Sequence, residues 1–128
     1  MTCDLVPVAC AQVEAYGDYV DCGEVDPWDS TLAEWEAARS CALENAAAMK
    51  AFKVIVWVQG IDSDVGYAYV GLTAESFEVV ELFYDSFGPT LTSRPCAALV
   101  ATPGCTVSVG DACLGCESDA EPATVCGG

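Results

Sequence analysis

Nine cysteines in 128 residues limit what this chain can fold into more than any other feature of its sequence. This density is typical of small proteins whose fold is held by disulfide bonds in an oxidising compartment. Four disulfides would leave one thiol, and the spacing alone does not fix which cysteines pair. The candidate disulfide cysteines are Cys3, Cys10, Cys22, Cys41, Cys96, Cys105, Cys113, Cys116 and Cys126.

Metal binding is the other common use of many cysteines, and the sequence argues against it. Only Cys113 and Cys116 have C-x-x-C spacing, whereas a four-thiolate zinc site usually contains two such pairs. The chain has no histidine, which excludes His-ligated metals and the Ser-His-Asp and Cys-His types of catalysis. We therefore expect no cofactor and no enzymatic activity.

The cysteines divide the chain into three parts. Four lie before residue 42, none lies in 42–95, and five follow. This distribution favours a centre that folds by packing, between flanks that depend on disulfides. We predict a single domain, 1–128, made of a disulfide-tied arm (1–29), a helix-plus-sheet core (30–102) and a disulfide-tied, coil-rich tail (103–128).

The core begins with the clearest element of the sequence, a helix over residues 30–51. Thr31 and Glu34 have the spacing of a capping box, and alanine is abundant after them. Apolar residues recur at three- and four-residue intervals, which predicts one buried stripe along the helix. Cys41 lies off this stripe, where it could tether the helix to a flank. The stripe comprises Leu32, Trp35, Ala38, Ala42, Ala46 and Met49.

Three segments rich in β-branched and aromatic residues follow the helix, at 52–60, 65–72 and 77–84. Cys96–Ala101 is a candidate fourth strand. Their short connections favour antiparallel pairing. The fold class predicted from this order is α+β, with one main helix packed on one face of an antiparallel three- to four-stranded meander.

The remaining segments have weaker patterns. A short helix is predicted within Val8–Tyr16. Asp18–Asp29 and Asp85–Pro95 contain glycine, proline or clustered carboxylates, and both are predicted to be loops.

The charge of the chain limits its partners. Lys and Arg number 4 against 20 Asp and Glu, so the net charge is -16. Nucleic acids and anionic membranes need clustered cations, so both are excluded as general partners. There is no apolar run long enough to span a bilayer. We expect an extracytoplasmic binding or structural module, secreted or at the cell surface, whose partner is another protein or a cell-surface component.

A divalent cation is a further candidate partner. Several carboxylates in the N-terminal arm would repel one another unless a cation lay between them, which makes this group a weak calcium site. Its members are Asp18, Asp21, Glu24, Asp26 and Asp29.

Five aromatic residues fall on neighbouring predicted strands. If some share the sheet face away from the helix, they form a platform for a sugar, an apolar ligand or a protein. Alternatively, the disulfide-tied flanks fold over them. The aromatic residues are Trp57, Tyr67, Tyr69, Phe83 and Tyr84.

A hydrolase that uses two opposed carboxylates is a second alternative function, although Glu78 and Glu81 lie on opposite faces of their strand.

Four short segments in the middle third resemble uncharacterised cysteine-rich secreted proteins or lipoproteins from bacteria. They are Trp35-(x)5-Cys41, Phe52-Lys-Val-Ile, Gln59-Gly-Ile-Asp-Ser63 and Ala68-Tyr-Val-Gly71. The resemblance implies an extracytoplasmic protein and no particular activity. In a lipoprotein Cys3 would carry the lipid; otherwise it pairs with another flank cysteine.

The order of helix and meander is also similar to that of cystatins, which are secreted inhibitors of cysteine proteases. Their inhibitory hairpin carries Gln-x-Val-x-Gly, and Val56-Trp-Val-Gln59-Gly60 has these residue types in a different order. The first alternative function is therefore a cystatin-like inhibitor that acts through the 59–64 hairpin. Its candidate interaction residues are Gln59, Gly60, Ile61 and Asp62.

Overall fold

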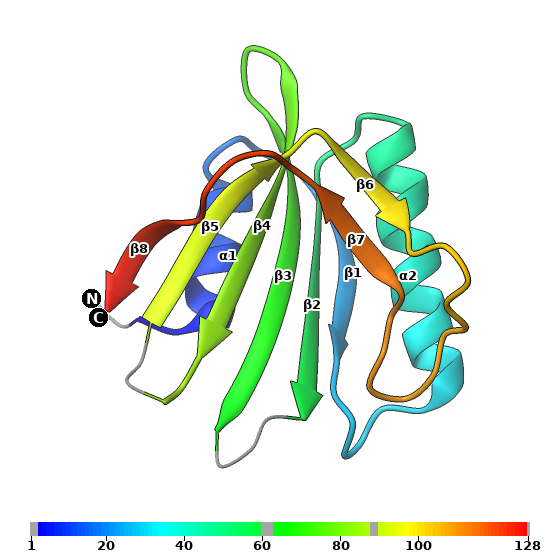
Figure 1. Cartoon of the computed structure of the whole chain (residues 1–128). Coiled ribbons are helices and arrows are strands. Elements are labelled where there is room, and N and C mark those ends of the chain that lie inside the picture. The colour runs from blue at the N-terminus through cyan, green and yellow to red at the C-terminus, as the bar shows by residue number, and fades with distance from the viewer. Residues whose placement is uncertain (1–2, 60–62, 88–89, 128) are drawn as a thin grey trace.

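The computed structural model of the chain describes residues 3–59, 63–87 and 90–127 (Figure 1). Within these ranges it contains a six-stranded sheet of order β1-β2-β3-β4-β5-β8, a separate β6–β7 pair and two helices. The helices are α1 (Leu5–Glu14) and α2 (Leu32–Ala47). The strands are β1 (Val20–Val25), β2 (Phe52–Gln59), β3 (Asp64–Thr73), β4 (Phe77–Asp85), β5 (Thr90–Cys96), β6 (Ala98–Ala101), β7 (Leu114–Glu117) and β8 (Ala123–Gly127).

Helix α2 is the predicted main helix, and it begins with the predicted capping box. The Thr31 hydroxyl accepts a hydrogen bond from the Glu34 amide at 3.2 Å, and the Glu34 carboxylate accepts one from the Thr31 amide at 2.9 Å. Each bond satisfies an amide that has no partner inside the helix. Trp35, Ala38 and Ala42 are buried, whereas Leu32 and Met49 are exposed, so the buried stripe is shorter than predicted.

The central meander is also confirmed. β2, β3, β4 and β5 pair antiparallel in sequence order, and the first three of these strands match the predicted segments 52–60, 65–72 and 77–84. β1 instead pairs parallel with β2. A parallel pair requires a crossover connection, and α2 supplies it.

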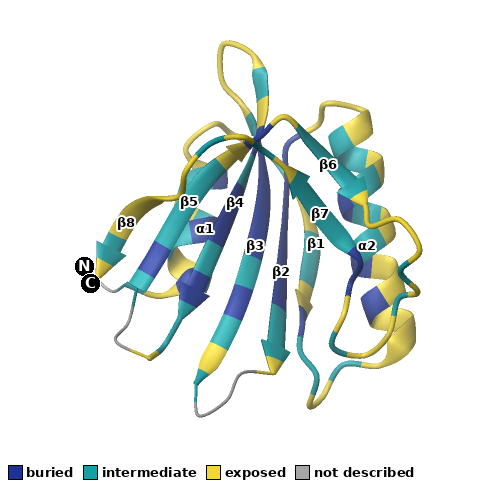
Figure 2. Cartoon of the chain, viewed as in Figure 1, coloured by how far each residue is buried: buried dark blue, intermediate teal, exposed yellow. Residues whose placement is uncertain are grey.

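The predicted number of strands was wrong. β1 lies inside the predicted loop Asp18–Asp29, β5 lies largely inside the predicted loop Asp85–Pro95, and β7 and β8 lie in the tail predicted to be coil-rich. β1 and β8 are the edges of the sheet and are largely exposed (Figure 2). Such strands need few apolar residues, so their sequences give little strand signal.

Both faces of the sheet are covered by a helix, and not one face as predicted. On one face Ile55, Val70 and Leu82 pack against Leu5 and Val13 of α1. α2 packs on the other face, where a second core forms around Trp35, Phe52, Val54 and Val79. In Figure 1, α1 lies behind the sheet and the β6–β7 pair lies close to α2. The result is a three-layer α+β fold.

Four disulfides confirm the predicted framework. They join Cys3 to Cys126, Cys22 to Cys41, Cys96 to Cys116 and Cys105 to Cys113. Cys41 tethers α2 to β1, as its position off the helix stripe predicted. The Cys3 bond brings the two ends of the chain together (Figure 1) and favours the alternative in which Cys3 belongs to the disulfide framework.

Candidate functional site

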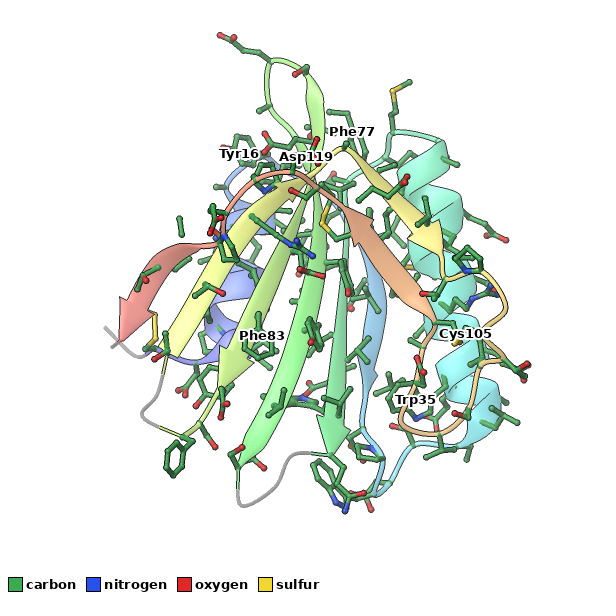
Figure 3. All side chains as sticks on the ribbon, in the orientation of Figure 1. Tyr16, Trp35, Phe77, Phe83, Cys105 and Asp119 are labelled. Carbon is green, nitrogen blue, oxygen red and sulfur yellow. A yellow bond between two sulfur atoms is a disulfide. The ribbon has the colours of Figure 1, made fainter. Side chains whose placement is uncertain are left out.

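A cavity of about 620 Å³ lies on the sheet face that also carries α2. Its floor is formed by side chains of β2, β3, β4 and β5, and one wall is the tail segment 110–116. α2 contacts mainly β1 and β2, so it leaves the surface of β3–β5 free. Figure 3 shows Phe83 on this open part of the sheet. We call this hollow the sheet-face cavity.

Strand register creates the floor of the cavity. In β3, β4 and β5, Tyr69, Glu81 and Arg94 lie directly opposite one another and form one row across the strands. Residues that are directly opposite in an antiparallel pair point to the same face. Two positions further along, Tyr67, Phe83 and Thr92 form a second row. One row is therefore aromatic and charged, and the other is mainly aromatic.

The Tyr67 ring pairs with each of the other two aromatic rings of the floor. The Tyr67 and Phe83 ring centroids are 5.1 Å apart with an interplanar angle of 51°, and those of Tyr67 and Tyr69 are 6.5 Å apart and nearly parallel. Both distances are typical of favourable aromatic pairs. Tyr69 is buried, whereas Tyr67 and Phe83 are half-buried and offer ring surface to a ligand.

An ion pair lies beside these rings. The Arg94 Nε donates a hydrogen bond to the Glu81 carboxylate at 2.8 Å, and the two side chains are 30% and 10% exposed. Tyr69 lies directly opposite Glu81 in the register of β3 and β4. Burial, and after it the negative charge of Glu81, raises the pKa values of Tyr69 and Tyr67 above the usual range, most strongly for Tyr69, so both hydroxyls stay protonated.

Two disulfides fix the wall of the cavity. Cys96–Cys116 joins β5 to β7, and Cys105–Cys113 closes the loop that precedes β7. The Cys113 amide donates to the Asp111 carboxylate at 2.9 Å, and the Thr102 amide donates to the Cys113 carbonyl at 2.8 Å. These covalent and hydrogen bonds join the wall to β5 and close its own loop.

The prediction of an aromatic platform on the face away from the main helix was wrong, because the aromatics of that face pack with α1, as the alternative in which a flank folds over them expects. Tyr67, Tyr69 and Phe83 share a face, although it is the face of α2 and not the one away from it. Trp57 and Tyr84 point to the α1 face, where their rings meet edge to face at 6.1 Å. The tail covers part of the platform and leaves the cavity beside it.

The calcium candidates occupy β1 and the turns on either side of it. The Asp21 carboxylate lies 3.8 Å from the Lys53 ammonium, and Glu24 accepts a hydrogen bond from the Trp57 indole at 2.6 Å. Asp26 accepts hydrogen bonds from the amides of Trp28 and Asp29. In the described part of the chain, no three of the five candidates bring their oxygens within 4.8 Å of one another, so calcium binding stays a prediction.

One group of three potential ligands does lie close together among the described residues: Cys105, Asp111 and Cys113. A cysteine binds a metal as its thiolate, and these two sulfurs are bonded to each other. With the disulfide formed, the group offers only one carboxylate and is not a metal site.

Cys10 has no disulfide partner among the described residues, and its sulfur lies 3.2 Å from the Lys53 ammonium. Burial alone would lower the pKa of Lys53, but the hydrogen bond with Cys10 and the charge of Asp21 outweigh it and raise that pKa. Lys53 therefore stays a cation, and the contact satisfies a charge that the strand largely buries.

The hairpin predicted to inhibit proteases is described only at its base. Gln59 ends β2 and pairs with Asp64, the first residue of β3. Gly60, Ile61 and Asp62 lie outside the described residues, so the interaction proposed for this hairpin stays a prediction.

The sequence did not single out Arg94 and Glu81 as a pair. Arg94 falls in a segment predicted to be a loop, and Glu81 was assigned only to a strand face. One signal was present: each is a charged residue among uncharged neighbours in its strand, a position usually found paired when buried.

Comparison of the chain with protein-family models, curated proteins and solved structures gives no match. The resemblances to bacterial cysteine-rich proteins and to cystatins therefore stay predictions. Neither helix in the described residues is long and apolar enough to cross a membrane.

Proposed function

We propose that this protein is a disulfide-stabilised extracytoplasmic binding module, not an enzyme, that holds a small amphipathic molecule in the sheet-face cavity. The observation that supports this most strongly is the floor of three aromatic rings beside one ion pair. Small-molecule sites are usually hollows of roughly 300–1,000 Å³ with apolar walls and a few polar groups. The cavity, at about 620 Å³, falls within that range.

The disulfides support the proposal that the protein acts outside the cytosol. Four of them tie both flanks to the sheet, and bonds of this kind persist mainly outside the reducing cytosol. The acidic composition keeps such a protein dispersed and disfavours anionic surfaces as partners.

The carboxylates of the cavity support binding over catalysis. A general acid or base must reach the proton that it transfers. Glu81 is already bonded to Arg94, and it is only 10% exposed. Asp111, the other carboxylate at the cavity, is exposed on the wall and accepts the Cys113 amide.

Filling the cavity should abolish binding. Thr92 lies in the second row of the floor, so Thr92→Trp places an indole where a ligand would lie. With the fluorescent probe anilinonaphthalene sulfonate, we expect saturable binding to the wild type and affinity at least roughly tenfold lower in the variant, because ring contacts of the ligand are lost. Fluorescence titration measures both.

Thr73→Trp is the matched control, since Thr73 is an exposed residue at the end of β3 outside the cavity lining. It should bind the probe as the wild type does. Thermal melting shows whether both variants are folded. If Thr92→Trp is folded and binds the probe with unchanged affinity, the cavity is not the binding site.

A further inference from the structure

We infer that the sheet-face cavity selects ligands that carry a carboxylate on an aromatic or apolar body, and that Arg94 binds this carboxylate. The inference rests on the proposed function and adds the chemical class of the ligand to it.

Arg94 has N–H groups that its ion pair with Glu81 does not use. A guanidinium has five N–H groups in one plane. Arg94 uses only its Nε in the bond to Glu81, and its two terminal nitrogens have no partner among the described residues. The side chain lines the cavity and is 30% exposed. The end of the guanidinium is therefore available to a ligand.

The hydrogen-bonding groups of the cavity indicate which polar group a ligand needs. Glu81 accepts a hydrogen bond from Arg94 and its side chain is only 10% exposed, so little of its carboxylate is offered to a ligand. The Tyr67 and Thr92 hydroxyls on the floor can donate as well as accept. Among the described residues, Arg94 is the only cationic side chain that lines the cavity, so a ligand with an anionic acceptor can pair with its unused N–H groups. A carboxylate presents two oxygens in one plane and matches the terminal nitrogens of arginine in a bidentate pair.

The aromatic residues of the floor indicate that the rest of the ligand is aromatic or apolar. Tyr67 and Phe83 are half-buried and adjacent, so their rings form one apolar surface next to Arg94. A ligand with a ring one or two bonds from its carboxylate can cover these rings while its oxygens reach the guanidinium. Burying that ring supplies the non-directional part of the affinity.

The net charge of -16 works against any anion, but it acts mainly at long range. At physiological ionic strength, charges more than about 8 Å apart are largely screened, and charge-assisted hydrogen bonds act at contact. Asp111 on the wall is exposed to solvent, which weakens its repulsion. Within the lining, the charge-assisted bonds from the terminal nitrogens of Arg94 have to outweigh the carboxylates of Glu81 and Asp111.

Three naphthyl probes that differ only in their polar group test this inference. They are naphthylacetate, naphthylacetamide and naphthylethylammonium, titrated into the full-length oxidised protein by calorimetry. We expect naphthylacetate to bind at least roughly tenfold more tightly than the amide, the effect of a charge-assisted bond, and the ammonium to bind most weakly.

Variants of the ion pair separate a ligand-binding arginine from a structural one. Arg94→Gln should remove the preference for the acetate. Glu81→Gln should increase it, because a neighbouring negative charge is lost while Arg94 remains. The double variant Glu81→Gln with Arg94→Gln keeps a neutral hydrogen-bonding pair, and should bind the acetate and the amide equally. If the ion pair were only structural, the two single variants would change the affinities in the same direction.

The outcomes distinguish the inference from the proposed function. If the amide or the ammonium binds as tightly as the acetate in the wild type, the inference is wrong and the proposed function stands. If the acetate preference survives Arg94→Gln in folded protein, Arg94 does not bind the carboxylate. If none of the three probes binds, the proposed function fails together with the inference.

Discussion

Replacing Cys3 and Cys126 by serine should lower the free energy of unfolding by about 5 kcal/mol, the largest loss expected from any single disulfide of this chain. The two cysteines are 123 positions apart, so their bond closes a loop of almost the whole chain. In the chain-entropy description, a disulfide stabilises by restricting the unfolded state, and the effect grows with loop length. Guanidinium chloride unfolding of the double variant measures the loss.

Loss of the Cys3–Cys126 disulfide should also destabilise β8 locally. Cys126 lies in β8, an edge strand whose other residues are exposed, so the disulfide is its main anchor to the core beside its pairing with β5. Without the bond, amide hydrogen exchange in β8 should become faster than in β3 and β4.

The disulfide Cys105–Cys113 provides the control, because its cysteines are only 8 positions apart. Replacing this pair by serine should cost about 2.5 kcal/mol on the same description. If both double variants lose the same stability, loop closure is not what the long disulfide contributes.

Trp35→Ala should destabilise the fold by about 3–5 kcal/mol, the range measured when a large aromatic residue is truncated in a packed core. Trp35 is 0% exposed and lies in the core between α2 and the sheet. Its indole also donates a hydrogen bond to the Asp26 carbonyl at 3.2 Å, which holds the turn before α2 against the helix. Truncation leaves a cavity and an unpaired carbonyl, and both raise the cost.

Trp28→Ala is the matched control, because Trp28 is 59% exposed in the same turn. Its removal should change the free energy of unfolding by about 0.5 kcal/mol or less, as expected for a surface substitution. Urea unfolding of both variants measures the difference. Equal losses would mean that the packing of α2 on the sheet is not as described.

The elements that the sequence predicted correctly are those with strong local patterns. The capping residues Thr31 and Glu34 and the recurrence of small apolar residues define α2 without reference to the rest of the chain. The apolar segments of β2, β3 and β4 are likewise recognisable from their own residues. Alternation with a period of two places Tyr67 and Tyr69 on one face of β3, and it places Phe83 and Tyr84 on opposite faces of β4.

The elements that were missed depend on partners far away in the sequence. β1 is a strand because it pairs with β2 across the whole of α2, and β8 is one because it pairs with β5. β5 itself has the sequence Thr-Leu-Thr-Ser-Arg-Pro-Cys, whose polar residues fit the open floor of the cavity and weaken the strand pattern. Local propensity is overridden by tertiary context in such segments.

Predicting the candidate site requires the strand register and the disulfide pairing, and local sequence patterns contain neither. Strand register places Arg94 opposite Glu81, and disulfide pairing places segment 110–116 beside the floor. A shift of one residue in register would turn either side chain to the other face. The sequence could therefore predict that Tyr67 and Tyr69 share a face, but not which face of the sheet stays open, the ion pair or the wall.

The most direct test of ligand binding in the sheet-face cavity is an NMR titration of the oxidised protein with naphthylacetate. The amides of β3, β4 and β5 near the two rows, and those of segment 110–116, should change their chemical shifts in proportion to occupancy. The amides of α1, on the opposite face, should not change. Shifts confined to α1 or to the outer surface of α2, or no shifts at millimolar probe, would contradict binding in the cavity.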